Sequence, residues 1–258
     1  MIKFFRKNRL NLVSEGKTIN YLKYALGEIV LVVIGILIAL QVNNWNTDRK
    51  KQLDAEELSK SLIAELEGMK YSVEDRSDKM NEQQKFIQYV INAKDIKMDS
   101  VLSFTNSFGF PMNPLNYLFT FKFYFNPRDD VYRSALNDGS LSIIEPKWIV
   151  YYLNTAYSMS VKRLTDHTMA ENEIVALINE HVSNEYQELF SSGQIKDNIG
   201  SWDDELTNTI LRKISTDGKL KYLLSARLQI LQFKWGDLKY VVLPKIEKAL
   251  ELLKENAQ

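Results

Sequence analysis

Residues 24–42 read YALGEIVLVVIGILIALQV, and they are the only stretch of this chain that water would reject. At a helical rise of about 1.5 Å per residue they span roughly 28 Å, close to the thickness of the hydrocarbon layer of a bilayer. A cleaved signal peptide has a shorter apolar core, of about 7–15 residues, followed by a small-residue cleavage site. The stretch Leu40-Gln-Val-Asn43 is a poor cleavage site. Residues 24–42 therefore predict an uncleaved transmembrane helix.

Basic residues before this stretch predict its orientation. Residues 1–23 contain Lys3, Arg6, Lys7, Arg9, Lys17 and Lys23. Arg49, Lys50 and Lys51 follow the stretch and are soon diluted by acids. Because the side richer in Lys and Arg stays in the cytoplasm, we expect a cytoplasmic or interfacial basic head at 1–23 and a domain at 43–258 outside the cytoplasm. Apolar residues alternate with the cations of the head, which fits either an amphipathic interfacial helix or a disordered flank.

One face of the predicted transmembrane helix carries unusual residues. Glu28 places a carboxylate in the apolar stretch beside Gly27, and helical spacing puts Gly35 and Ala39 nearly in line with it. Gly35-x-x-x-Ala39 is a small-x-x-x-small pair that lets two helix backbones approach closely, so this face is predicted to pack against another helix. Glu28 has three open interpretations: it reaches the interface and does nothing, it pairs with a polar group on a partner helix, or it carries protons or ions in a membrane machine.

The composition excludes several classes of function. Lys plus Arg and Asp plus Glu both total 33, so the chain lacks the basic excess expected of a nucleic-acid-binding protein. The absence of cysteine removes disulfides, thiolate metal sites and Cys nucleophiles. Few glycines and prolines, with many Leu, Ile, Lys and Glu, favour helices.

Apolar periodicity beyond residue 43 predicts an all-α domain. Apolar residues recur at three- and four-residue steps over 46–93, either as one long helix continuing from the membrane or as a helix broken near Gly68. A helix restarting at residue 47 would be capped by Thr47 or Asp48. Further helices are predicted at 147–190, 203–214 and 219–255, with a possible kink at Pro244. These helices predict a bundle of about four long helices around an apolar core, with no cofactor inside it.

Residues 94–127 interrupt the helical pattern as an irregular, aromatic-rich insertion. Its second half, LNYLFTFKFYF at 115–125, fits a short helix or an alternating strand. Four phenylalanines would share one face of such a strand: Phe119, Phe121, Phe123 and Phe125. If this face is exposed it is a partner-binding surface; the alternative is an aromatic lid over the helical core.

No constellation predicts catalysis or a metal site. His167 and His181 are about 21 Å apart along one helix, too far to share a metal, and the pair of His167 with Glu171 lacks further ligands. No Gly-x-Ser-x-Gly motif is present. The adjacent carboxylates Asp129-Asp130 and Asp203-Asp204 fit helix caps, and Glu65, Glu67, Glu171 and Glu173 are expected on solvated helix faces. We therefore expect no enzyme, no metal and no cofactor.

The segment VYRSALNDG at 131–139 predicts a short helix. Arg133 stands among its apolar residues and is predicted to form a structural ion pair with a buried Asp or Glu. Gly139 is predicted to stop the helix, because glycine adopts the left-handed conformation at a C-terminus without strain.

The N-terminal residues also resemble a known family. MIKFFRK at 1–7, SEGK at 14–17 and YALGEIVLVVIGILIALQVNNWN at 24–46 are similar to the N-terminus of a family of uncharacterised single-pass membrane proteins of Bacteroidota-type bacteria. The segment at 131–144, VYRSALNDGSLSII, resembles a second recurrent segment of that family. The resemblance implies an inner-membrane anchor with a domain in the periplasm, and it implies no catalytic residues.

Together these patterns predict a membrane-anchored interaction or scaffold protein. We expect contact with membrane lipid and assembly as a homo-oligomer or membrane-protein complex through the transmembrane helix, with the periplasmic bundle presented to a partner. Two alternatives stay open: a periplasmic sensor or small-ligand-binding module, and an accessory subunit of an ion-driven membrane machine that uses Glu28.

Overall fold

The computed structural model describes residues 18–106, 113–124, 128–191 and 204–256. Within these ranges all regular structure is helical, which confirms the predicted all-α class. The α-helices are α2 (Thr18–Asn92), α3 (Met98–Asn106), α4 (Pro114–Phe119), α5 (Asp130–Asn137), α6 (Trp148–Asn154), α7 (Ser160–Glu185), α8 (Gln187–Ser191), α9 (Asp204–Thr216), α10 (Gly218–Asp237) and α11 (Leu243–Asn256). A 3₁₀ turn, η1 (Ser140–Ile143), and two π-helical turns, η2 (Thr155–Met159) and η3 (Leu238–Val242), lie between them.

Helix α2 contributes to both of the units into which the chain divides, Met1–Glu57 and Leu58–Gln258. It continues without a break at Gly68, and it does not restart at Thr47, whose Oγ1 donates 2.9 Å to the Asn43 carbonyl one turn earlier. Of the two predicted possibilities, one long helix is therefore correct. In the first unit, α2 contains one stretch long and apolar enough to cross a membrane by length and composition.

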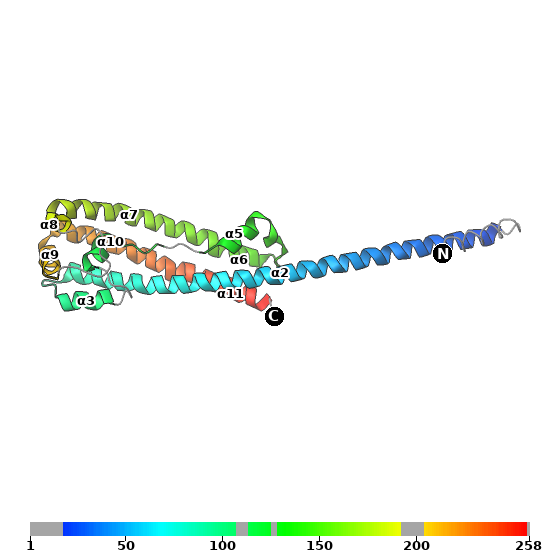
Figure 1. Ribbon diagram of the computed structural model, residues 1–258, viewed down its shortest axis with the longest axis horizontal. Coiled ribbons are helices and arrows are strands. Elements are labelled where there is room, and N and C mark those ends of the chain that lie inside the picture. The colour runs from blue at the N-terminus through cyan, green and yellow to red at the C-terminus, as the bar shows by residue number, and fades with distance from the viewer. Residues whose placement is uncertain (1–17, 107–112, 125–127, 192–203, 257–258) are drawn as a thin grey trace. The chain divides into compact units, whose positions relative to one another are not determined.

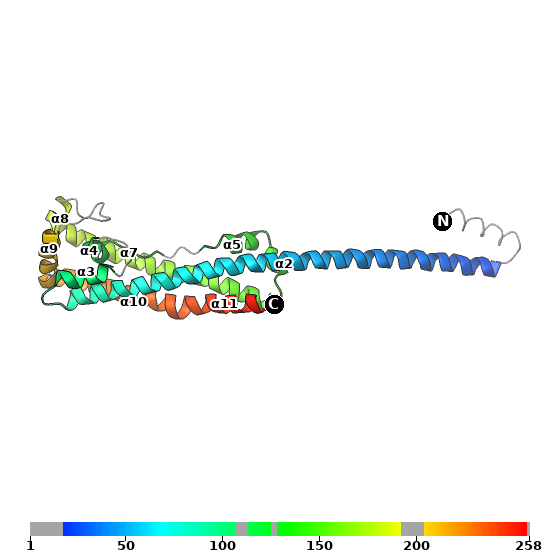
Figure 2. The same cartoon turned by 60° about the horizontal axis from the view of Figure 1, so that its bottom comes forward.

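Three long helical segments surround the core in the described part of the second unit. They are residues 58–92 of α2, the series α6–η2–α7 and the series α10–η3–α11, which lie lengthwise beside one another (Figures 1 and 2). Helix α2 and the α6–α7 series run in the same direction and the α10–α11 series runs in the opposite one. Each segment buries apolar residues at three- and four-residue steps, as Leu62, Leu66 and Met69 do in α2.

The prediction of about four long helices is not confirmed, because the chain between α2 and α6 does not return as a helix. Helix α4 lies toward one end of the second unit and α5 toward the other (Figure 2). Phe121–Tyr124, within the described part of the connection between them, is irregular, with neither helix nor strand. Phe121 and Phe123 of this stretch pack on the core in place of a fourth helix, whereas Tyr124 is exposed.

Both long C-terminal segments contain a π-helical turn. The predicted kink at Pro244 is absorbed in this way: the Leu243 N–H donates to the Leu238 carbonyl five residues earlier, just before the proline. Proline has no N–H to donate and its ring crowds the preceding turn, so a wider turn at this point lets the helix continue into α11.

Gly139 ends α5 as predicted, with a left-handed φ of +78°. A Cβ added there would meet no atom within 4 Å, so Gly139→Ala is expected to destabilise only through backbone strain, by about 1–2 kcal/mol. The matched control is Gly68→Ala, which also enters open space but within helix α2, and is expected to stabilise by about 0.5–1 kcal/mol. Chemical denaturation of the full chain in mild detergent measures both; equal effects of the two substitutions would contradict the prediction.

Candidate functional site

Residues 115–124, the described part of the aromatic run at 115–125, lie over the core. Phe119 and Phe123 are 1% and 7% exposed, and Phe121 packs partly buried against the core with its ring 4.8 Å from that of Phe123. Phe125 lies outside the described residues. Phe119 belongs to helix α4, so the strand interpretation is wrong. The described phenylalanines pack as an aromatic lid over the core and do not form an exposed partner surface.

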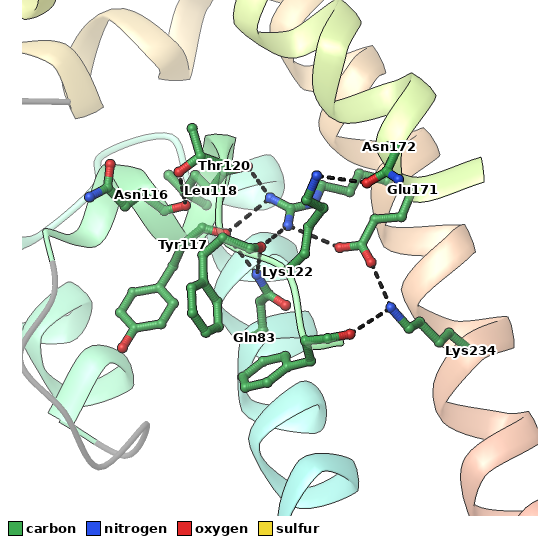
Figure 3. Close-up of polar contacts among 12 residues, drawn as sticks. Gln83, Asn116, Tyr117, Leu118, Thr120, Lys122, Glu171, Asn172 and Lys234 are labelled. Carbon is green, nitrogen blue, oxygen red and sulfur yellow. Dashed lines mark hydrogen bonds and ion pairs between the residues drawn. The ribbon is translucent and has the colours of Figure 1, made fainter. Parts of the chain in front are cut away.

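A buried cluster of charges lies beneath this lid. Glu171 of α7 accepts hydrogen bonds from two cations of α10: Arg227 Nη2 at 3.1 Å from Oε1, and Lys234 Nζ at 2.9 Å from Oε2. All three side chains are 0% exposed. Figure 3 shows the contact of Glu171 with Lys234. The expectation that Glu171 faces solvent is wrong.

The two cations also bind the backbone of the lid. Arg227 Nη1 donates to the carbonyls of Tyr117 and Leu118 at 3.1 and 2.6 Å, and Nη2 also donates to the carbonyl of Phe121. Lys234 Nζ donates 2.7 Å to the Phe123 carbonyl (Figure 3).

Gln83 of α2 holds the same segment from the other side. Its Nε2 donates to the carbonyls of Tyr117 and Phe121 at 2.9 and 3.1 Å (Figure 3). Side chains of α2 and α10 thus bind one short segment, which consists of the last turn of α4 and the irregular backbone after it. Carbonyl groups of this segment are satisfied by these side chains.

The cluster contains two cations against one carboxylate, so it carries a net positive charge inside the core. The partial negative charges of four backbone carbonyls offset the unpaired cation. Burial lowers the pKa of Arg227 from its usual value, and the nearby Glu171 carboxylate opposes that change. The cluster therefore joins α7 and α10 to the chain's own backbone carbonyls at the lid.

Each histidine is paired with an aspartate near α10. His181 Nε2 lies 2.7 Å from Asp217 Oδ2, which also accepts from the Tyr186 hydroxyl at 2.9 Å. His167 Nε2 lies 2.8 Å from Asp237 Oδ2. Among the residues that the structure describes, no group of three His, Asp or Glu side chains is placed to hold a metal ion.

Asp217 also caps α10, since its Oδ1 accepts 2.8 Å from the Leu220 N–H. Burial works to raise the pKa of Asp217, but the hydrogen bonds from Leu220, His181 and Tyr186 prevail and the pKa is lowered. A carboxyl with a lowered pKa in the folded state contributes stability above its unfolded pKa of about 3.9, and that stability is lost as the pH falls through the folded pKa.

Asp217→Asn is therefore expected to flatten the loss of stability in acid. At neutral pH it is expected to lower the free energy of unfolding by about 1–2 kcal/mol, because the charge-assisted hydrogen bonds weaken. The difference from the original chain is expected to shrink as the pH falls below the unfolded pKa of about 3.9. Denaturation of the full chain from pH 7 down to about pH 2 measures this, with the exposed Asp78→Asn as control. A difference that does not change with pH would contradict the assignment.

Arg133 forms an ion pair, but not the buried one that was predicted. Its Nη2 lies 2.6 Å from Asp129 Oδ2 one turn earlier, and its side chain is 67% exposed. Helix α5 buries Tyr132 and Ala135, which turns Arg133 toward solvent.

The predicted caps of α5 are also replaced. Asp129 stands at the N-cap without a capping side-chain bond. Glu65 of α2 caps the helix instead: its Oε2 accepts from the Val131 N–H at 2.7 Å and its Oε1 from the Tyr132 N–H at 3.2 Å. Tyr157 of η2 donates its hydroxyl to Oε1 at 2.7 Å. Glu65 is therefore a tertiary cap and not the solvated surface acid that was expected.

The membrane-face residues Gly27, Glu28, Gly35 and Ala39 all lie in the first unit of α2. A Cβ added at Gly27 or Gly35 would meet no atom within 4 Å, and Gly35 and Ala39 are exposed. Gly35 and Ala39 are thus accessible to a neighbour from outside the chain, whereas Glu28 is half-buried.

Comparisons with protein-family models, with curated proteins and with solved structures find no match for this chain. The structure itself defines the class: an all-helical protein with one N-terminal helix apolar and long enough to span a membrane.

Proposed function

We propose that this protein is a membrane-anchored interaction protein, which assembles through its transmembrane helix and presents its helical second unit to a partner. The observation that carries the proposal is the exposure of the large apolar side chains in one stretch of α2, in a chain that buries a separate core. The large apolar side chains described between Leu22 and Val42 are 46–69% exposed. A continuous apolar surface of this kind marks contact with lipid or with another protein.

The small residues of this stretch support assembly. Gly35 and Ala39 leave a shallow strip on the helix where a second backbone can approach closely, and Glu28 lies on the same face. A carboxylate at that depth is favourable when a neighbouring helix supplies a polar partner. The strip therefore fits a helix of a second copy or of another membrane protein.

The flanking charges support the orientation that we propose, with residues 1–23 in the cytoplasm and 43–258 in the periplasm of a bacterial inner membrane. Lys and Arg are more numerous before the apolar stretch than directly after it. In the second unit, Tyr222 and Phe233 are 73% and 70% exposed on one face of α10 and offer a contact surface for a partner.

Gly35→Leu is the sharpest test of assembly. The leucine would fill the strip where helices approach, so the full chain purified in mild detergent is expected to lose its oligomer or its co-purified membrane partner. Ile36→Leu is the matched control, since it introduces the same side chain about 100° around the helix and is expected to change nothing. Size-exclusion chromatography with identification of co-purified proteins measures both. Identical complexes from the two variants would refute assembly through this face.

The anchor and its orientation are tested separately. The full chain is expected to stay with membranes in alkaline carbonate, and its release would refute the anchor. Because the sequence has no cysteine, a single Lys219→Cys substitution can be labelled with a membrane-impermeant maleimide. Labelling in intact spheroplasts is expected, and labelling only after lysis would reverse the proposed orientation.

A further inference from the structure

A ring of cations follows the apolar stretch at a defined height on α2. Arg49, Lys50 and Lys51 are consecutive and exposed, and we call them the cationic collar. Since successive helical residues are about 100° apart, the three side chains spread over about 200° of the helix circumference. The helix is continuous here, so the collar is held rigidly relative to the apolar stretch.

The backbone of the collar lies just beyond the headgroup layer of a bilayer, within reach of its long side chains. At about 1.5 Å per residue, Trp45 lies about 4–5 Å beyond Val42 and the collar about 10–14 Å beyond it. The headgroup layer occupies roughly the first 5–8 Å beyond the hydrocarbon on each side. Long cationic side chains extend several ångströms and can reach back into this layer.

Trp45 contacts Arg49 of the collar and holds its side chain toward the headgroup layer. The guanidinium carbon of Arg49 lies 5.8 Å from the centre of the Trp45 ring, within the range of a cation–π contact. Trp45 is 63% exposed, at the level where tryptophan is enriched in membrane proteins. Within the described residues, no carboxylate lies at ion-pair distance from Arg49, Lys50 or Lys51.

The cations of the collar oppose the membrane orientation that we propose. Under the proposed orientation it must cross the membrane during insertion, against the rule that cations stay in the cytoplasm. Residues 43–53 contain only one acid, Asp48, against the three collar cations. Attraction to anionic lipid of the outer leaflet of the inner membrane gives these charges a stabilising role once they have crossed.

We propose that Trp45 and the cationic collar bind the phosphate groups of anionic phospholipids at the membrane surface beyond Val42. The inference rests on the proposed membrane anchor. The ligand class is a phospholipid headgroup and not free phosphate, because the same short segment joins an apolar surface for the acyl chains to the cations for the headgroup.

Native mass spectrometry of the full chain in mild detergent tests this. The protein is titrated with phosphatidylglycerol and with phosphatidylcholine of identical acyl chains, and the ratio of bound lipids is measured. The original chain is expected to prefer phosphatidylglycerol, and the Arg49→Gln, Lys50→Gln, Lys51→Gln triple variant is expected to lose about tenfold or more of that preference. The matched control is Lys7→Gln, Arg9→Gln, Lys17→Gln, which removes three cations from the basic head and leaves the collar intact.

The outcomes separate the possible sources of binding. An unchanged preference in the collar variant, with its loss only in the head variant, would overturn the proposal. Displacement of the lipid by an excess of inorganic phosphate would identify free phosphate as the ligand and would also overturn it. Carbonate extraction of every variant is run alongside: retention with loss of lipid preference supports the collar, whereas release of the original chain refutes the anchor itself.

Discussion

Replacing Glu171 with glutamine is expected to lower the free energy of unfolding by about 3–5 kcal/mol. Glu171 is the only carboxylate bound to Arg227 and Lys234 within the described residues, and all three side chains are fully buried. Removing its charge leaves two cations in the core with only neutral carbonyl groups to compensate them. Such cations can be neither solvated nor neutralised cheaply, so the loss is expected to exceed that of any surface substitution.

Glu173→Gln is the matched control for this substitution. Glu173 lies two residues further along the same helix and is exposed. It undergoes the same chemical change and is expected to alter stability by less than about 0.5 kcal/mol. Guanidinium denaturation of the full chain in mild detergent, followed by circular dichroism, measures both variants. Equal stability of the two would mean that the cations are not buried as the structure has them.

A second comparison covers the case in which Glu171→Gln does not fold. Lys234→Met removes one of the two cations and retains much of the apolar volume, so Glu171 stays paired with Arg227. It loses one hydrogen bond to Glu171 and one to the Phe123 carbonyl, and is expected to cost about 1–3 kcal/mol. A cost greater than that of Glu171→Gln would show that the lysine, and not the carboxylate, is the limiting partner.

The apolar helix over residues 24–42 and the long helices after it could be predicted from the sequence because each depends on local pattern. Residues 24–42 are apolar throughout, and the helices at 147–190 and 219–255 follow the spacing of their leucines and isoleucines. The π-helical turns within them have no such signal, since an apolar stripe continues across a wider turn. The return between α2 and α6 was less predictable still, because its backbone is held by side chains from two distant helices, Gln83 of α2 and Arg227 and Lys234 of α10.

The buried charges can be recognised in the sequence because each interrupts an apolar stripe of its helix. The spacing between charged residues does not reveal them. Glu171 lies seven residues from Leu164 and from Ile178, both of them buried, and so interrupts an apolar stripe. Arg227 lies between Leu224 and Leu231 in the same manner, and Lys234 between Leu231 and Leu238. Glu65 follows Leu62 by three residues and precedes Met69 by four. Charges at such positions face the core, whereas the sequence does not tell which charge on another helix meets them.

Glu65→Gln is the second substitution with a large expected effect, a loss of about 2–3 kcal/mol. The carboxylate accepts two N–H groups at the first turn of α5 and the hydroxyl of Tyr157, so it joins three segments that are distant in sequence. Burial, together with Glu65, raises the pKa of Tyr157, so this hydroxyl stays protonated and donates at neutral pH. Glutamine retains only one acceptor oxygen and its amide would face a donor.

Glu67→Gln is the matched control, because it makes the same chemical change at an exposed ion pair. The difference between the two variants measures the effect of the helix cap alone. Glu67 pairs with Lys254 at 2.6 Å, but the two side chains are 54% and 50% exposed, and such a pair contributes at most about 0.5–1 kcal/mol. Tyr157→Phe removes only the hydroxyl and is expected to cost about 1 kcal/mol, less when Glu65 is already glutamine. A double-mutant cycle of Glu65 and Tyr157 measures that coupling by denaturation. Additive effects, or an effect at Glu65 no larger than that at Glu67, would mean that α5 is held by its stacked Tyr132 and Tyr157 rings, 4.1 Å apart, and not by the carboxylate.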